Sequence, residues 1–191
     1  MAAIGLLFGS FNPVHHGHLL LATHLREAAG LDEIWFIVSP QNPFKLNSDL
    51  VDEYHRLEMV KLAVENVPYF NVSDIEFQLD KPSYTHITLK KLQHQFPSHQ
   101  FSLIIGKDNA ANFQEWKEAD WILNNVEILV YNRTVEDKTI NFQLTAFNYY
   151  NLPLFDISST IIRKRVKENQ SVRYFVPENV EHYIRFHKLY Q

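Results

Sequence analysis

Cysteine is absent from this 191-residue chain. Its absence excludes disulfide bonds, cysteine-ligated zinc and a thiol nucleophile. A chain without thiols is compatible with a reducing cytoplasm, where we expect the protein to work. Any chemistry that the chain performs must therefore rest on other side chains.

Long apolar runs and a strong charge of one sign are also missing. No stretch approaches the roughly 20 apolar residues that a membrane span needs. The opening MAAIGLLFGSF has no basic segment before its short apolar core, so it predicts a buried first strand and not a signal peptide. The formal net charge of -4 gives no case for binding to nucleic acid or to a membrane. The 14% aromatic content permits self-association into a homo-oligomer without indicating it.

Apolar segments typical of strands alternate with segments of helical periodicity along the chain. In chain order, we expect strands at 4–8, at 33–39, within 69–77, and at 100–106, 126–132 and 154–158. We expect helices at 17–30, 53–66, 82–96, 159–170 and 177–190. Because connections of this length require parallel neighbours, the prediction is an α/β fold with a doubly wound parallel sheet. It forms a single domain over 1–191, with a C-terminal helical part from about residue 158.

Four polar clusters follow predicted strands. They are GSFNPVHHGH, SPQNPFK, GKD and ISST, and the last of them follows the short strand expected at 154–158. The carboxyl ends of parallel strands meet at one edge of a sheet, and ligands of such sheets bind beyond that edge. The sequence therefore predicts a ligand site there.

The first cluster holds three histidines within four positions. His15 and His18 are three residues apart where a loop becomes a helix, so their side chains share one face. His24 lies about 9 Å further along the helix, too far to complete a metal site with them. The residues alone leave three interpretations: the histidines pack and cap the helix, they form an anion cradle, which helix N–H groups favour, or, as the least favoured reading, they hold a metal with ligands from elsewhere. Gly17 between them would let a bulky ligand approach the backbone.

The last cluster, DISSTIIR, places hydroxyl groups and an arginine at another helix start. Ser158 is the expected N-cap, and Arg163 lies about one turn beyond Ser159, so it reaches the same space. Alone, this pattern is typical of an ordinary capped helix with a solvated basic face. Beside the histidine loop it indicates the second half of a triphosphate clamp, in which Arg163 neutralises charge.

Three other positions also keep two interpretations. Lys45 could contact a phosphate or only solvent. Gly106 to Asp108 could be a plain turn, or it could place a carboxylate against a ribose. Trp116 is either a core residue or a platform on which an aromatic ring stacks.

Two motifs resemble those of the HxGH nucleotidyltransferase superfamily and come in the expected order, HHGH at 15–18 and ISSTIIR at 157–163. Over nearly the whole chain, the sequence most resembles the bacterial nicotinate-nucleotide adenylyltransferases. That resemblance rests on FGSFNPVHHGHLLLA, PQNPFK, PSYTHITL, IIGKD, Trp116 and VPENVEHYI. Phosphopantetheine adenylyltransferases usually have threonine in the place of His15 and lack the PSYT element.

The resemblance implies a Rossmann-like nucleotidyltransferase fold that joins ATP and nicotinate mononucleotide into nicotinate adenine dinucleotide, with release of pyrophosphate, in NAD biosynthesis. It implies that His15, His18 and Arg163 are catalytic. The ATP-binding residues that it implies are Gly9, Ser10, Phe11, His15, Gly17, His18, Gly106, Asp108, Ser158, Ser159 and Arg163. Those for the mononucleotide are Lys45, Tyr84, Thr85 and Trp116. Mg²⁺ would arrive with ATP, and no transition metal would be held by the protein.

The chain departs from the family pattern at three positions. Phe8 and Lys81 stand where glycine is usual, and Asp80 stands where a small or variable residue is common. Phe8 is expected to narrow the turn after the first strand. Nicotinamide mononucleotide and phosphopantetheine therefore stay open as acceptors. Two other classes also stay open, a metal-dependent phosphohydrolase that uses the histidine cluster and a non-catalytic nucleotide-binding module.

Overall fold

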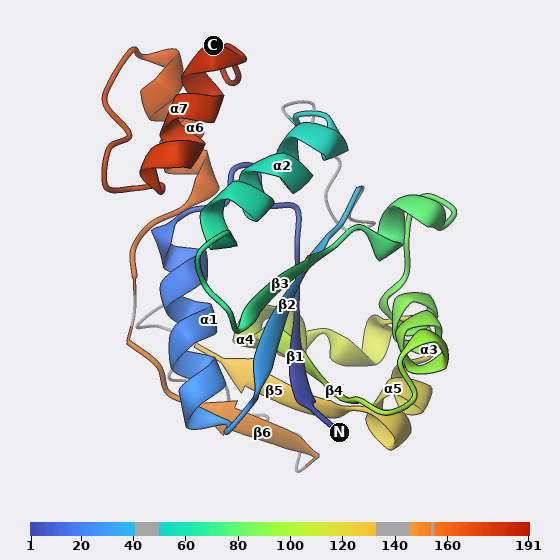
Figure 1. Ribbon diagram of the computed structural model, residues 1–191. Helices are drawn as coiled ribbons and strands as arrows, with labels where there is room; N and C mark the ends of the chain where they lie inside the picture. Colours follow the sequence, from blue (N-terminus) through green and yellow to red (C-terminus); the bar gives the residue numbers. More distant parts are fainter. Residues whose placement is uncertain (41–49, 133–145, 154) are drawn as a thin grey trace.

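The computed structural model describes residues 1–40, 50–132, 146–153 and 155–191. Its centre is a six-stranded parallel sheet in the order β3-β2-β1-β4-β5-β6 (Figure 1). The strands are β1 (Ala3–Gly9), β2 (Glu33–Val38), β3 (Phe70–Ser73), β4 (Gln100–Gly106), β5 (Glu127–Tyr131) and β6 (Phe147–Tyr150). The predicted doubly wound parallel sheet is therefore confirmed.

Helical segments connect the strands and follow the last of them. The α-helices are α1 (His16–Ala28), α2 (Glu53–Val64), α3 (Thr85–Gln95), α4 (Lys107–Ala111), α5 (Ala119–Asn125), α6 (Ser159–Lys167) and α7 (Glu178–Phe186). Two short 3₁₀ segments are η1 (Ile75–Gln78) and η2 (Phe113–Glu115). Within the described ranges, no helix is long and apolar enough to cross a membrane.

The sheet separates two apolar cores because successive side chains of a strand point to opposite faces. Leu7 of β1 belongs to the core formed with α1, α2, α6 and α7, whereas Leu6 belongs to the core formed with α3 and α5. Figure 1 shows α1 and α2 on one side of the strands, and α3 and α5 on the other. Leu25 of α1 is fully buried, which stabilises the fold by about 1.5–3 kcal/mol.

The strand order reverses between β1 and β4, which makes this pair the switch point of the sheet. The two strands pair in parallel, with Leu7 opposite Ile104. Both therefore end at the same edge, β1 at Gly9 and β4 at Gly106. The histidine loop and the GKD turn leave the sheet side by side at this edge.

The last predicted strand is wrong. The sixth strand is β6 at Phe147–Tyr150, and the described residues from 155 to 158 are not in a strand. Tyr131 of β5 pairs with Tyr150, and this pairing ends the strand before the apolar pair Leu154 and Phe155 that suggested one. The ISST cluster therefore does not directly follow β6, and residues 151–153 and 155–158 belong to no strand.

The buried face of α2 also differs from the apolar pattern in the sequence. Within the helix expected at 53–66, apolar residues recur at helical spacing from Tyr54 onward, yet Tyr54 is 67% exposed. The buried residues of the helix are Arg56, Leu57, Met59, Val60 and Val64. Arg56 thus takes a core position, and the reason lies in the neighbouring loops described below.

Candidate active site

The site begins with the loop after β1, which carries His15 as the N-cap residue of α1. The His15 and His18 rings stack with their centroids 3.7 Å apart. The backbone N–H of His15 donates to Nδ1 of His18 at 3.2 Å. Because this nitrogen accepts, the ring proton of neutral His18 belongs on Nε2. The expected shared face of the two histidines is thus present.

His15 is 5% exposed. Burial, with a smaller effect of His16, lowers the pKa of the His15 imidazole to about 3. The side chain is therefore neutral at pH 7 and can exchange hydrogen bonds without adding charge. Positive charge at this site must come from other groups.

Gly17 leaves space for the His15 ring. A Cβ on Gly17 would lie 3.0 Å from Nδ1 and 3.1 Å from Cε1 of His15, and 3.5 Å from the carbonyl oxygen of Ile157. The approach of a ligand to this backbone stays a prediction. The same space brings the segment before α6 against the start of α1.

Phe11 packs against the His18 ring. It adopts a left-handed φ of 45°, which is uncommon for a residue other than glycine. Its ring is buried and meets the His18 ring edge-on with centroids 5.1 Å apart. A Cβ on Gly9 would lie 2.8 Å from this ring, so Gly9 is needed for the packing. A nucleotide could contact Phe11 only through its backbone.

The ISSTIIR motif reaches back to the histidine loop across more than 140 residues of sequence. The hydroxyl of Ser159 donates to the carbonyl of Pro13 at 2.9 Å. Nη1 of Arg163 donates to the carbonyl of Asn12 at 3.0 Å. Ser158 caps α6 by accepting from the N–H of Ile161 at 3.3 Å, as its position in the sequence predicts. The two halves of the predicted clamp are thus in direct contact.

Arg56 organises the loops on the other side of the histidines, and sequence reasoning missed it. Its buried guanidinium donates to the carbonyls of Val51, Ser10, Ser39 and Pro40 at 2.7–2.8 Å. Burial lowers the pKa of the guanidinium. The only sequence signal was the position of this charged residue, four residues before the buried Val60 and therefore on the same face of the helix.

Glu76 was also missed, and it connects the histidine loop to the start of α3. Its buried carboxylate accepts from the hydroxyls of Ser83 and Thr88, both at 2.8 Å. Ser39 bonds to it as well, and the N–H of Ser39 donates to the carbonyl of Gly9 at 2.9 Å. Burial raises the pKa of Glu76, and the three hydroxyl hydrogen bonds oppose that rise.

Two residues predicted to bind the mononucleotide begin α3, Tyr84 as its N-cap and Thr85 as its first residue. The ammonium of Lys117 lies 3.7 Å from the centroid of the Tyr84 ring. This contact joins the start of α3 to the segment between η2 and α5, which carries Trp116. Two parts of the sequence more than 30 residues apart therefore meet here.

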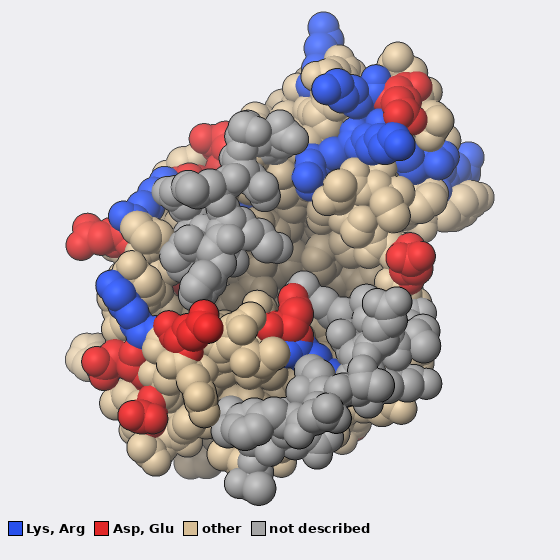
Figure 2. All heavy atoms as spheres, turned by 180° about the vertical axis from the view of Figure 1, so that it is seen from behind, with Lys and Arg blue, Asp and Glu red and all other residues tan. Residues whose placement is uncertain are grey.

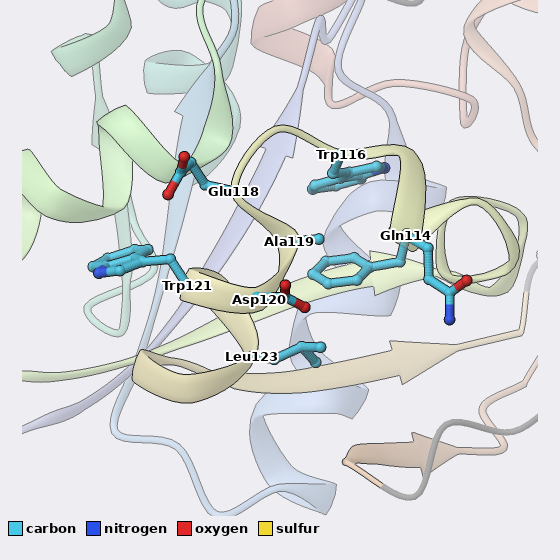
Figure 3. Close-up of a pocket in the computed structure, with 8 residues that line it drawn as sticks. Gln114, Trp116, Glu118, Ala119, Asp120, Trp121 and Leu123 are labelled. Atoms are coloured by element: carbon cyan, nitrogen blue, oxygen red, sulfur yellow. The ribbon is translucent and has the colours of Figure 1, made fainter.

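A pocket of about 480 Å³ lies between η2 and α5. Its lining residues are Phe113, Gln114, Trp116, Glu118, Ala119, Asp120, Trp121 and Leu123. Figure 3 shows Trp116 at one end of this pocket and Leu123 at the other. The Trp116 ring also packs on Phe113, with centroids 5.1 Å apart. Trp116 is therefore part of a hollow and not of a closed core.

The remaining predicted positions lie at the expected edge, with one exception. Gly106 ends β4 and is the N-cap residue of α4. Asp108 lies in the first turn of α4 and is exposed. Lys45 lies outside the described residues.

Other histidines and the departures from the family pattern have structural surroundings of their own. His24 stacks on Phe155, 5.9 Å between centroids. The N–H of His16 donates to the carbonyl of Phe175 at 2.9 Å, so that helix-start group is already bonded. Phe8 lies within β1 and pairs with Ile37 of β2. Because Phe8 lies in the strand, this pairing does not support the expectation that it narrows the turn. Lys81 forms an ion pair with Glu53 at 2.6 Å.

Charge is unevenly distributed over the molecule. Lys and Arg side chains gather over the C-terminal helices in Figure 2. The last turn of α6 contributes Lys164, Arg165 and Lys167. Among the residues that the structure describes, no three His, Asp or Glu side chains are grouped to hold a metal ion.

Residues 6–165 match the model of the Cytidylyltransferase-like family, and the chain belongs to that family. It is 45% identical over 187 residues to the probable nicotinate-nucleotide adenylyltransferase of Cytophaga hutchinsonii, with 98% of this chain and 97% of that protein covered. It is 37% identical over 191 residues to the protein of the same name from Bacillus pumilus, with 100% of both covered. Within the broader family, the chain is therefore a member of the nicotinate-nucleotide adenylyltransferases.

A solved structure supports the fold. The nicotinic acid mononucleotide adenylyltransferase of Plasmodium falciparum, in complex with NaAD, aligns with a TM-score of 0.78 at 20% identity. The alignment covers 100% of this chain and 98% of that one. At this identity the likeness concerns the architecture alone.

Proposed function

We propose that the protein transfers the adenylyl group of ATP to nicotinate mononucleotide, giving nicotinate adenine dinucleotide and pyrophosphate. The observation that carries this proposal is the contact between the two motifs. Ser159 and Arg163 bond to the loop that leads into His15 and His18. Phosphate-binding groups thereby gather at the switch point of the sheet, where such folds bind nucleotides. The names of the relatives point to the same reaction.

The chemistry needs positioning and charge neutralisation more than acid–base catalysis. A phosphate oxygen of the mononucleotide, already ionised at neutral pH, forms a bond to the α-phosphorus of ATP. The bond from that phosphorus to the bridging oxygen breaks, and pyrophosphate leaves with the electron pair. The protein must align the two anions and stabilise the charge that moves onto the leaving group.

We assign the polyphosphate to the two motifs. His15 and His18 would hydrogen-bond the phosphates around the α-phosphorus, His18 through Nε2–H. Ser158, Ser159 and Arg163 would hold the β- and γ-phosphates. Arg163 would supply the positive charge that neutral His15 does not carry. Mg²⁺ would come with ATP, bound to phosphate oxygens and water.

We assign the mononucleotide to the region between α3 and α5. Trp116 would stack on the pyridine ring, and Thr85 would help to hold its carboxylate. Tyr84 would line the same subsite, and Lys45 would neutralise a phosphate between the two substrates. Asp108 would accept hydrogen bonds from a ribose. The network of Glu76 supports this assignment, because it ties Ser83 and Thr88 to the loop after β2.

Pyrophosphate release with ATP and Mg²⁺ tests the proposal, with nicotinate mononucleotide, nicotinamide mononucleotide and phosphopantetheine compared as acceptors. We expect the highest kcat/KM with nicotinate mononucleotide. Preference for either other acceptor would keep adenylyl transfer and overturn the acceptor. ATP binding without pyrophosphate release from any acceptor would indicate a non-catalytic module. Phosphate release that depends on a retained transition metal would indicate a phosphohydrolase.

A further inference from the structure

Tyr190 lies beyond the last helix, yet its side chain reaches the histidine loop. Its hydroxyl donates to Oδ1 of Asn12 at 2.9 Å. Asn12 is buried, and its carbonyl is the group that accepts from Arg163. One residue of the loop thus receives both the tyrosine hydroxyl and the clamp arginine.

The end of α7 is built to send Tyr190 back toward this loop. The N–H of Leu189 donates to the carbonyl of Ile184 at 3.0 Å, which closes the helix with a tight turn. Lys188 and Tyr190 adopt left-handed φ values of 51° and 65°. Leu189 between them is buried in the same core as α1 and α2, and so anchors the turn.

The Tyr190 hydroxyl makes its hydrogen bond to Asn12 in a largely buried environment. Burial raises the pKa of Tyr190, while the charges of Arg163 and Arg56 act in the opposite direction. The group is therefore a neutral donor at physiological pH. The Asn12 oxygen that it bonds also accepts from the N–H of Val51 at 3.3 Å, next to the carbonyl that Arg56 binds.

We propose that Tyr190 is a positioning residue of the active site, which holds Asn12 so that Arg163 is set for the polyphosphate of ATP. The inference rests on the proposed function for the identity of that polyphosphate. Tyr190 touches no reacting atom in this account; it acts on the substrate through Asn12 and Arg163. Without the Tyr190 hydroxyl, the Asn12 side chain would lose one of its hydrogen bonds. The Asn12 carbonyl, which accepts from Arg163, could then move.

The test is Tyr190→Phe, which removes only the hydroxyl. We expect the KM for ATP and the Kd for ATP, measured by titration calorimetry, to rise about three- to tenfold, the range for one lost hydrogen bond. The KM for nicotinate mononucleotide should stay within about twofold of the wild-type value, because the mononucleotide does not meet Arg163. General loosening of the fold would raise both constants, and that result would overturn the proposal.

The matched control is Tyr183→Phe. This change removes the hydroxyl of a tyrosine within α7, which lies 2.9 Å from Nδ1 of His55. We expect it to leave both KM values unchanged. An equal rise in the KM for ATP from both variants would overturn a specific role for Tyr190.

A double-mutant cycle with Arg163→Lys tests the route of the effect. If Tyr190 acts through the guanidinium, Tyr190→Phe should change the Kd for ATP by less than about twofold in the Arg163→Lys background. An undiminished effect there would overturn the route. Failure of the wild type to release pyrophosphate would refute the proposed function, while the Kd for ATP would still decide the role of Tyr190. Absence of ATP binding by the wild type would refute both.

Discussion

The backbone N–H of His15 donates to Nδ1 of His18, and the two rings stack with centroids 3.7 Å apart. The His15 backbone therefore fixes the His18 ring, and this hydrogen bond selects the His18 tautomer with a proton on Nε2. The contact couples the start of α1 to the group that we assign to the α-phosphate. In His18, Nδ1 makes the hydrogen bond within the protein, and Nε2 is the atom that we assign to the phosphate. A substitution can therefore remove one of these two interactions and keep the other.

His18→Asn should lower kcat by about 10²–10³, the loss expected when one charge-stabilising donor is removed. The asparagine oxygen lies near the place of Nδ1 and can still accept from the His15 N–H, but no group remains near Nε2. We therefore expect the free energy of unfolding to change by less than about 1 kcal/mol. Pyrophosphate release and urea denaturation measure the two quantities. Wild-type turnover in this variant would refute the assignment of Nε2, whereas His18→Gln should retain more activity.

Gly17→Ala should lower turnover more than about tenfold while changing the free energy of unfolding by no more than about 1 kcal/mol. The new Cβ would displace the His15 ring, since its atoms lie 3.0–3.1 Å away. Higher helix propensity of alanine offsets part of the cost of that shift.

Gly30→Ala is the control for Gly17→Ala. A Cβ there meets nothing within 4 Å, but φ is +65°. We expect a loss of roughly 1 kcal/mol in stability and unchanged turnover. Full activity in Gly17→Ala, or equal loss of activity in both variants, would contradict the packing argument.

Arg56→Lys should lower the free energy of unfolding by about 2–4 kcal/mol, measured by urea denaturation. A lysine ammonium cannot reach the four carbonyls that the planar guanidinium bonds, and buried carbonyls without partners are costly. The control is Arg26→Lys, which removes an exposed hydrogen bond to Asp32 and should cost less than about 1 kcal/mol. Similar losses in the two variants would contradict the special role of Arg56.

The stability of the protein should depend on His15 between pH 6.5 and pH 3. The pKa of His15 is about 3 in the folded protein against its ordinary value of 6.5, so in this range the unfolded chain binds a proton that the folded chain does not. The contribution of His15 is fully present above pH 6.5 and falls as the pH is lowered, by up to about 1.4 kcal/mol per unit.

His15→Asn isolates this contribution. Urea denaturation of both proteins from pH 7.5 to pH 4.5 should give a constant stability difference above pH 6.5. Below it, the wild type should lose about 1 kcal/mol per pH unit relative to the variant. Groups common to both proteins, such as Glu76 with its raised pKa, cancel in the difference. Parallel profiles over the whole range would show that His15 is not held neutral by burial.

Predictions from the sequence succeeded where local pattern and position along a strand were sufficient. Apolar runs and helical periodicity indicated the parallel sheet, and the order of strands and loops placed the histidine loop and the GKD turn at the same edge. They failed at the last strand, because pairing with β5 selected Phe147–Tyr150 over the more apolar segment that follows. The apolar periodicity of α2 also gave no sign that Arg56 is buried, where its guanidinium bonds carbonyls of the two loops that follow β1 and β2.

The sequence by itself determined the two motifs and all the strands of the sheet except the last, because hydrophobic periodicity, caps and glycine placement are properties of neighbouring residues. Only the tertiary structure decided how these parts act on one another. Burial made His15 neutral, Gly17 made room for its ring, and Arg163 and Tyr190 met on Asn12. Those outcomes depend on desolvation and on contacts between residues more than 140 positions apart, and such quantities exist only once the chain has folded.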